Sequence, residues 1–170
     1  MLTMRRFLVF VVCVALSASL ASAAESKQTA DFNLQRVNPK GALVVLRTLA
    51  NTRQIVMVDD HTVRVSDDES KIADVRAIVG LIEDPAEGPV TVQLADGSTI
   101  AMASLRRASA RDVLTALRTK LQIRRIATIE GDGSMSSLVL VRDSDEQAQE
   151  ALKLIAEMDG GSGTEGGANP

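Results

Sequence analysis

An internal repeat constrains this chain more than any other feature of its sequence. Residues 38–55 match residues 109–126 at a shift of 71, and residues 65–82 match residues 141–158 at a shift of 76. The matched pairs are Asn38 with Ser109, Leu46-Arg47-Thr48 with Leu117-Arg118-Thr119, Ile55 with Ile126, Val65 with Val141, Asp67 with Asp143, Ile78 with Leu154, and Ile82 with Met158. The difference between the two shifts falls within residues 130–136, where a loop insertion costs little. We infer that one structural unit is used twice.

Apolar periodicity gives the first unit, residues 32–85, the order strand, helix, strand, strand, helix. The predicted strands cover residues 32–37, 54–58 and 62–65, and the predicted helices follow caps at Asn38 and Ser66. Asparagine is a favoured cap, Pro39 fits the first helical position, and Ser66 with Glu69 matches a capping box. We expect the second helix to stop before Pro85, because proline disfavours a helical residue ahead of it.

The second unit, residues 88–159, repeats this order after an added hairpin. The predicted strands cover residues 99–105, 123–129 and 137–141, and the predicted helices follow Ser109 and the pair Asp143 with Glu146. Residues 89–94 and 99–102 are expected to pair across a tight turn at Asp96-Gly97. The predicted fold class is therefore α+β, with two tandem βαββα modules, each a three-stranded sheet packed against two helices.

Residues 1–23 have the pattern of a signal peptide. Arg5 and Arg6 give a positive start, residues 7–16 are apolar, and small residues precede a cut after Ala23, with Ala24 as the near alternative. A retained membrane anchor is the competing interpretation, but the apolar run is shorter than the about 20 residues that span a bilayer. We therefore expect an exported, periplasmic protein with no stable membrane span after cleavage.

Composition narrows the classes of function. Cys13 leaves with the signal peptide, so apolar cores rather than disulfides must hold the mature chain. Loss of two arginines takes the formal net charge from −3 to −5, which argues against nucleic-acid binding. Because tryptophan and tyrosine are absent and Phe32 is the one phenylalanine left, stacking on bases or sugars is nearly excluded. Residues 160–170, rich in glycine, are expected to form a disordered tail.

The second half of each unit has a common pattern: an apolar strand, a short polar stretch, and a helix ending in an apolar residue close to an acid. It runs from Thr62-Val63-Arg64-Val65-Ser66-Asp67 to Ile82-Glu83-Asp84, and again from Leu138-Val139-Leu140-Val141 to Glu157-Met158-Asp159. In this pattern the chain resembles the periplasmic N-terminal ring-building domains of secretins, the outer-membrane channels of secretion and pilus systems. The resemblance covers residues 32–159. It implies assembly with protein partners, either a secretin-type channel or further copies of the chain, at the outer membrane.

One departure from the secretin pattern affects the expected role. The many further strands of a secretin channel do not follow residue 159, where the Gly- and Ser-containing tail begins instead. The resemblance therefore implies an accessory protein or a fragment rather than a channel.

Candidate catalytic and metal-binding residues are few. His61 is the single histidine, and no cysteine or second histidine completes a metal site beside Asp59 and Asp60, so a solvated turn residue is the better interpretation. The acids at residues 67–69 suit the first turn of a helix without an acid–base role. Residues 131–134 lack the lysine and helix of a phosphate loop, and KH-type RNA binding requires a Gly-x-x-Gly loop between helices that the chain lacks. We expect no enzyme activity, cofactor, metal or nucleic-acid partner.

Surplus apolar residues and segregated charge favour protein association. Residues 42–46 are all apolar on a helix that turns about 100° per residue, so Leu43 or Val44 must face away from its own core, as must Leu81 on the next helix. These side chains either complete a wide core, contact the other unit, or meet a partner.

Charge is uneven along the second unit. Residues 106–125 hold seven basic residues, Arg106, Arg107 and Arg111 among them, against one acid, whereas residues 126–159 hold eight acids against two basic residues. Such faces either stay solvated or pack head to tail between neighbouring chains.

The sequence therefore favours an exported, non-catalytic assembly or scaffold protein of the cell envelope, associated with a secretion or pilus system. The alternative is a monomeric periplasmic adaptor that presents a sheet edge, such as residues 90–94, to a peptide.

Overall fold

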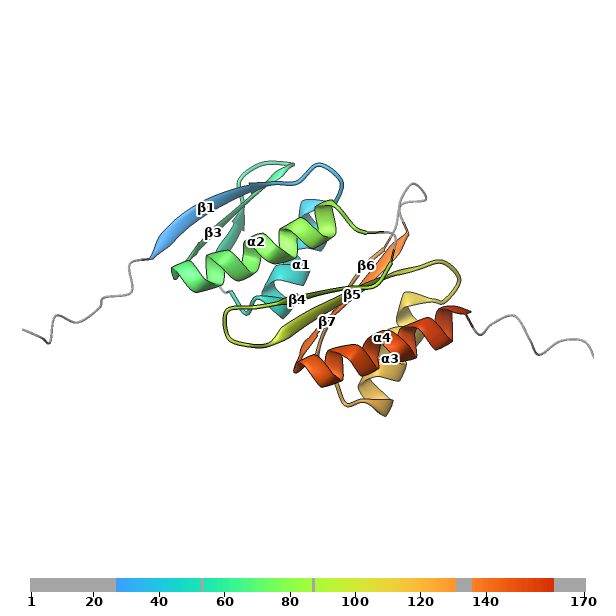
Figure 1. Ribbon diagram of the computed structural model, residues 1–170. Coiled ribbons are helices and arrows are strands. Elements are labelled where there is room, and N and C mark those ends of the chain that lie inside the picture. The colour runs from blue at the N-terminus through green and yellow to red at the C-terminus, as the bar shows by residue number, and fades with distance from the viewer. Residues whose placement is uncertain (1–26, 53, 87, 131–135, 161–170) are drawn as a thin grey trace, which may run out of the picture.

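The computed structural model describes residues 27–160 apart from residues 53, 87 and 131–135. The predicted signal peptide, most of the loop that holds the length difference of the repeat, and the tail beyond Gly160 lie outside the described residues. In chain order the elements are β1 (Gln28–Asn33), α1 (Pro39–Leu49), β2 (Ile55–Met57), β3 (Thr62–Asp67), α2 (Glu69–Glu83), β4 (Val90–Gln93), β5 (Thr99–Leu105), α3 (Ala110–Lys120), β6 (Arg125–Ile129), β7 (Ser137–Asp143) and α4 (Asp145–Gly160) (Figure 1). The order βαββα occurs twice, and β4 precedes its second occurrence.

The strands form two antiparallel sheets. The first sheet has the order β1-β3-β2, and the second has the order β4-β5-β7-β6. β4 and β5 are joined by a tight turn in which Gly97 has φ of 82°, a left-handed conformation that glycine adopts without steric cost. The predicted α+β class is confirmed, and the predicted hairpin gives the second sheet its fourth strand.

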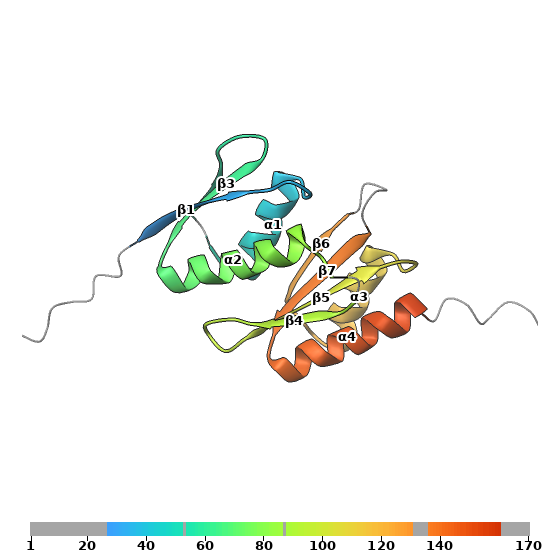
Figure 2. The same cartoon turned by 45° about the horizontal axis from the view of Figure 1, so that its top comes forward.

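Sheets and helices alternate in four layers: the first sheet, α1 with α2, the second sheet, and α3 with α4 (Figures 1 and 2). One hydrophobic cluster joins α1, α2 and the first sheet to one face of the second sheet, including Met102, Leu138 and Leu140. A second cluster joins α3 and α4 to the opposite face. The two predicted units are therefore docked through a shared core.

Side-chain alternation explains how the second sheet is covered on both faces. Along β7, Leu138 and Leu140 lie in the cluster with α1 and α2, whereas Val139 and Val141 lie in the cluster with α3 and α4. All four are fully buried. A sheet that is covered on both faces requires nearly continuous apolar strands, which is why these four apolar residues follow one another without a polar interruption.

β1 lies four residues earlier than the predicted strand at residues 32–37. The chain leaves the sheet after Asn33 because the backbone N–H groups of residues 35–37 donate to the carboxylate of Glu83, at the end of α2, over 2.8, 3.1 and 3.2 Å. This carboxylate is remote in sequence, so local periodicity carries no sign of it.

Two predicted helix caps are also corrected. Ser66 belongs to β3, and α2 is instead capped by Asp68, whose carboxylate accepts a hydrogen bond from the backbone N–H of Lys71 at 2.8 Å. Likewise, β7 continues through Asp143, so α4 begins after Ser144 rather than after the predicted cap. In both units the strand before the second helix stays paired for two residues beyond its last apolar residue. The first helix of each unit begins after its predicted cap.

A carboxylate that binds three consecutive backbone N–H groups occurs at the same place in both units. Asp159, at the end of α4, accepts hydrogen bonds from residues 106–108 over 2.7 to 3.1 Å. The shift of 76 maps Glu83 onto Asp159, and the shift of 71 maps residues 35–37 onto residues 106–108. The two carboxylate contacts therefore follow the same register as the sequence repeat.

The turn after the first helix has the same backbone conformation in both units. Asn51 has φ of 54° and Gln122 has φ of 56°, and these two residues follow the C-caps Ala50 and Leu121 of α1 and α3. A left-handed residue directly after the cap is a common way to end a helix. Asn51 and Gln122 are also 71 residues apart.

Removing the Asp159 carboxylate tests how much this contact stabilises the fold. We expect Asp159→Ala to lower the free energy of unfolding by about 1.5–3 kcal/mol, the range for hydrogen bonds to a charged group. Glu157→Ala, at an exposed position of the same helix, should change it by less than about 0.5 kcal/mol. Urea denaturation followed by far-UV circular dichroism measures both variants, and equal midpoints for the two would contradict the expectation.

Acid provides a second measurement of the same contact. Burial acts to raise the pKa of Asp159, but the N–H groups of residues 106–108 and the charge of Arg106 outweigh it and lower that pKa below its usual 3.8. Because the folded-state pKa is depressed, the stabilisation is fully present above the usual pKa and is lost as the pH falls below it. The stability difference between wild type and Asp159→Ala should therefore shrink in acid.

Candidate protein-interaction surfaces

Arg142 crosses the interface between the two units. It continues the face of β7 on which Leu138 and Leu140 lie, and it is 5% exposed. Its Nη1 donates to the carbonyl oxygen of Leu49 at the end of α1 over 2.5 Å, and its Nη2 lies 3.4 Å from the carboxylate of Asp74 on α2. Arg142 belongs to the second unit, and its guanidinium is thus hydrogen-bonded to both helices of the first unit.

The β4–β5 turn holds the same guanidinium from its other side. Nη2 lies 2.6 Å from the carboxylate of Asp96, and Nε donates to the hydroxyl of Ser98 over 2.8 Å. Hydrogen bonds from Ser98, together with Arg142, outweigh burial and lower the pKa of Asp96 to about 2. Asp74 is 6% exposed and also accepts a hydrogen bond from the backbone N–H of Ala95. We call these side chains, Arg142 with Asp74 and Asp96, the Arg142 clamp. The hydrogen bonds of the clamp join residues of the same chain, so the clamp holds the two units together.

The three apolar residues predicted to face away from their own core lie in different environments. Leu81 is 8% exposed and belongs to the shared core, and Leu43 is half-buried and packs against that core. Of the alternatives that the sequence left open for these residues, Leu81 and Leu43 therefore match completion of a core shared with the other unit, because the second unit covers α1 and α2. Val44 is 57% exposed and stays a candidate for a partner contact.

β2, at the edge of the first sheet, and the residue that follows it carry further exposed apolar side chains. Val56 is 56% exposed, Val58 is 46% exposed and Met57 is 39% exposed. We call these three residues the β2 edge. Val56 lies beside Arg64 of β3, which makes two hydrogen bonds of 2.7 Å to the carboxylate of Asp31 on β1. Val56, Arg64 and Asp31 thus form a row across the three strands, on the face of the sheet that points away from the helices.

The backbone of β2 also has an unpaired side. Val58 donates its N–H to the carbonyl oxygen of Thr62, across from β2, over 2.9 Å. Hydrogen-bonded residues alternate along an antiparallel pair, so Val56 is bonded to β3 while the backbone groups of Ile55 and Met57 point to the open edge. A row of this kind is a template for a further strand. Sequence periodicity did not single out β2, because the strand order that makes it an edge strand is a long-range property.

β4, at the edge of the second sheet, differs from β2. Leu94 donates its N–H to the carbonyl oxygen of Ser98 over 2.8 Å, so Val92 is also bonded inward, to β5. The backbone groups that point outward belong to Thr91 and Gln93, whose exposed side chains are polar. As the alternative function, we predicted from the sequence that β4 presents its edge to a peptide. Compared with β4, however, the β2 edge is more apolar.

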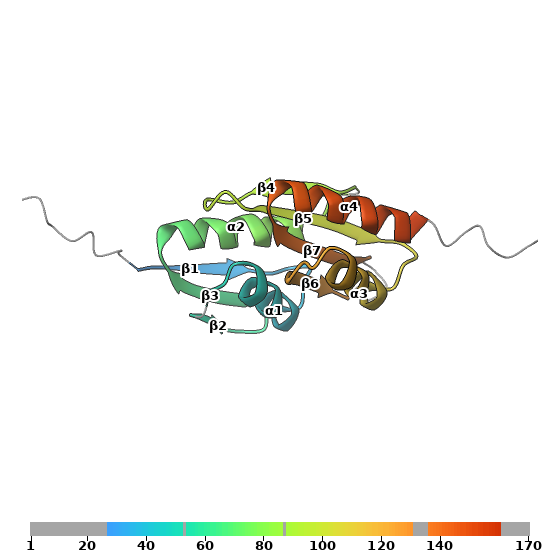
Figure 3. The ribbon, with the colours of Figure 1, turned by 90° about the horizontal axis from the view of Figure 1, so that it is seen from below.

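α3 and α4 lie side by side on the outer face of the second sheet and carry opposite charge (Figure 3). α3 holds Arg111, Arg118 and Lys120 against one acid, and α4 holds five acids against Lys153. Arg106 and Arg107 precede α3 and, like Arg111, are exposed. Among the described residues, no ion pair joins α3 to α4. The charge segregation seen along the sequence therefore separates two neighbouring helices of one layer.

Other candidate chemistry lies on the surface. His61 is exposed in the turn between β2 and β3, where its backbone N–H donates to the carboxylate of Asp59 over 2.8 Å. Within residues 27–52, 54–86, 88–130 and 136–160, histidine, cysteine and acidic side chains form no group of three or more that could hold a metal ion. No helix in those same ranges has the length and apolar character that a membrane crossing requires.

Comparison with known proteins gives a weak structural likeness. No protein-family model and no curated protein matches the sequence. Among solved structures, the fold is similar to the N-terminal domain of the secretin XcpQ from Pseudomonas aeruginosa, with 16% sequence identity and a TM-score of 0.34. The match covers 79% of this chain and 62% of that one, so the chain spans less than two thirds of its neighbour. A likeness at this level assigns no function by itself.

Proposed function

We propose that this protein is an exported, non-catalytic assembly module of the cell envelope, in which the β2 edge of one copy joins a second copy. The observation that carries the proposal is an edge strand with an open backbone side and exposed Val56, Met57 and Val58. The role fits the secretin-like residue pattern and the signal-like residues 1–23, which together favour a scaffold in a secretion or pilus system.

An apolar edge strand of this kind is a liability for a protein that stays alone. Soluble proteins protect edge strands with charged side chains, proline or a covering segment, because an open edge pairs with other chains. β2 contains neither a charged residue nor a proline. Pairing with another strand would satisfy the outward backbone groups of Ile55 and Met57 and remove the apolar side chains from water, at roughly 25 cal/mol per Å² of buried apolar surface.

Charge supports a second copy as the neighbour. The basic surface of α3 and the acidic surface of α4 belong to one layer, so each copy offers both signs to another copy. Complementary patches of this type orient chains and set the register in which they meet. A neighbour with a single sign of charge would match only half of this layer.

Charge on the β2 edge tests the proposal. We expect the chain from Ala24 onward to form concentration-dependent oligomers in sedimentation velocity, and we expect the double variant Val56→Lys with Val58→Lys to sediment as a monomer. Like charges on adjoining strands repel, and a lysine must lose its water to be buried. Thr91→Lys, at an exposed position on the edge strand β4, is the matched control and should oligomerise as wild type does.

Two results would contradict the proposal. In the first, wild type stays monomeric at every concentration. In the second, Thr91→Lys and the β2 double variant reduce association equally, which would indicate a general effect of added charge.

A further inference from the structure

β5 continues beyond the end of its pairing with β4. The last pair of this ladder is Val90 with Met102, whereas β5 stays paired with β7 as far as Leu105 opposite Ser137. On the β4 side, β5 is therefore an edge strand over its last three residues. This open end is independent of the β2 edge, which lies in the other sheet.

The direction of the backbone identifies which residue faces the open side. The hydrogen bond from Leu94 to Ser98 fixes the alternation, so Ile100 and Met102 direct their backbone groups toward β4. Ser104 is the next residue in this series, and it lies beyond the last paired residue of β4. A short extended segment placed here would meet the N–H and carbonyl groups of Ser104.

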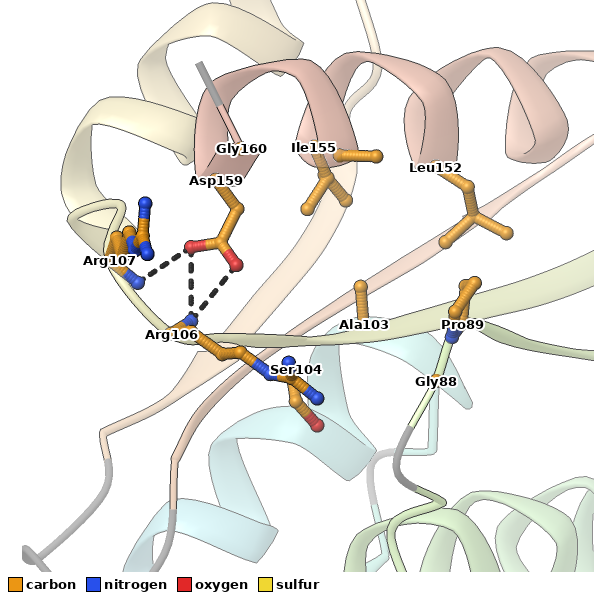
Figure 4. Close-up of a pocket in the computed structure, with 11 residues that line it drawn as sticks. Gly88, Pro89, Ala103, Ser104, Arg106, Arg107, Leu152, Ile155, Asp159 and Gly160 are labelled. Carbon is orange, nitrogen blue, oxygen red and sulfur yellow. Dashed lines mark hydrogen bonds between the residues drawn. The ribbon is translucent and has the colours of Figure 1, made fainter. Parts of the chain in front are cut away.

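A groove of about 500 Å³ lies along this open end, with the residues Gly88, Pro89, Ala103, Ser104, Arg106, Arg107, Leu152, Ile155, Ala156, Asp159 and Gly160 around it. Figure 4 shows Leu152 and Ile155 of α4 extending toward Ala103 on one side, with Pro89 opposite. The middle of the groove is therefore apolar and the strand edge runs along its floor. Its volume is in the range of sites that hold small ligands or a few residues of peptide.

Two arginines give one end of the groove a positive charge. The backbone N–H groups of Arg106 and Arg107 are bound to the Asp159 carboxylate at 3.0 and 2.7 Å, so their positions on the chain are fixed. Neither guanidinium forms an ion pair with any residue that the structure describes, and both arginines are exposed. Figure 4 shows the Arg106 side chain extending past Ser104. The Asp159 carboxylate lies at the same end and is influenced by the charge of Arg106, so two guanidinium groups face one carboxylate there, and the remaining positive charge suits a further carboxylate.

We propose that this groove binds an extended acidic segment of a partner protein. The segment pairs its backbone with Ser104, places an apolar side chain between Leu152 and Pro89, and places a carboxylate against Arg106 and Arg107. Addition of a strand to an open edge gives affinity through the main chain, and the flanking pocket and charges give selectivity. The contact does not depend on self-association through the β2 edge, so either proposal can fail without the other.

A selection of displayed random peptides on the immobilised chain from Ala24 onward tests this proposal. We expect enrichment of peptides with Asp or Glu next to an alternating apolar segment. Fluorescence anisotropy with the most enriched peptide should then give a Kd that is weakened about tenfold or more by Arg106→Glu with Arg107→Glu. Arg124→Glu with Arg125→Glu, an exposed basic pair away from the groove, is the matched control and should leave the Kd unchanged within about twofold.

Two further measurements distinguish this site from its alternatives. A copy of the peptide with alternate backbone amides methylated should lose binding, because the methylated amides cannot pair with Ser104. A chain that ends at Gly160 should bind the peptide as the longer chain does. Failure to enrich any peptide, equal binding by both double variants, or binding that appears only after residues 161–170 are removed would each overturn the proposal; the last result would make the chain's own tail the occupant.

Discussion

Arg142→Ala is expected to lower the free energy of unfolding by about 3–5 kcal/mol, the cost of removing one member of a buried ion pair. The substitution leaves Asp74, which is 6% exposed, without its cationic partner, and it leaves the carbonyl of Leu49 without its donor. Asp96 is less affected, because its carboxylate is half exposed and also bonds to Ser98. The loss should therefore arise where α1 and α2 meet the second sheet.

Arg125→Ala is the matched control for this variant. Arg125 lies directly opposite Arg142 on β6, has the same charge, and is exposed. Its removal should change stability by less than about 0.5 kcal/mol. A double variant, Arg142→Met with Asp74→Asn, should recover much of the loss, because it removes the uncompensated buried charge along with its partner. Equal urea midpoints for Arg142→Ala and Arg125→Ala would show that the Arg142 clamp contributes nothing.

Leu140→Ala is expected to lower the free energy of unfolding by about 2–5 kcal/mol, the range for truncating a fully buried leucine. Leu140 belongs to the second unit but lies in the cluster with α1 and α2, so the cavity would open between the units. Because that core is shared, we expect both units to unfold together, in wild type and in the variant. Val44→Ala, at an exposed position, should change stability by less than about 0.5 kcal/mol.

Hydrogen exchange under native conditions can follow each unit separately in the Leu140 experiment. The amides of Val65 in β3 and Ala127 in β6, which bond to β1 and β7, report on the first and the second sheet. The same loss of protection at both positions would agree with one cooperative body. A loss confined to one of them would mean that the units unfold independently and that the shared core is weaker than its burial indicates.

Local sequence patterns predicted most elements because those elements depend on local rules. The helix starts at Asn38 and Ser109, the end of α2 before Pro85, and the strand at residues 99–105 all lie where caps, proline and apolar spacing put them. The boundaries that were missed depend on partners far along the chain. β1 ends early because Glu83 binds the residues that follow it.

The interaction surfaces were harder to predict than the elements. The apolar run at residues 42–46 indicated surplus apolar surface, and Val44 is exposed as that run allows. Leu81 has the same sequence signature but is buried, because docking of the second unit covers α2. Edge position and docking are properties of the assembled sheets, so a single helical pattern cannot distinguish these two residues. Arg142 could have been noticed as a charge directly after the apolar residues 138–141, on the same face of the strand as Leu138 and Leu140.

The most direct test of assembly through β2 is hydrogen exchange at Ile55 and Met57, measured by nuclear magnetic resonance at low and high protein concentration. The amides of these two residues point to the open edge, whereas the amide of Val56 is bonded to β3. If a second copy pairs with β2, exchange at Ile55 and Met57 slows as the concentration rises, while exchange at Val56 changes far less. Rates at Ile55 and Met57 that stay fast in the oligomer would contradict this mode of assembly.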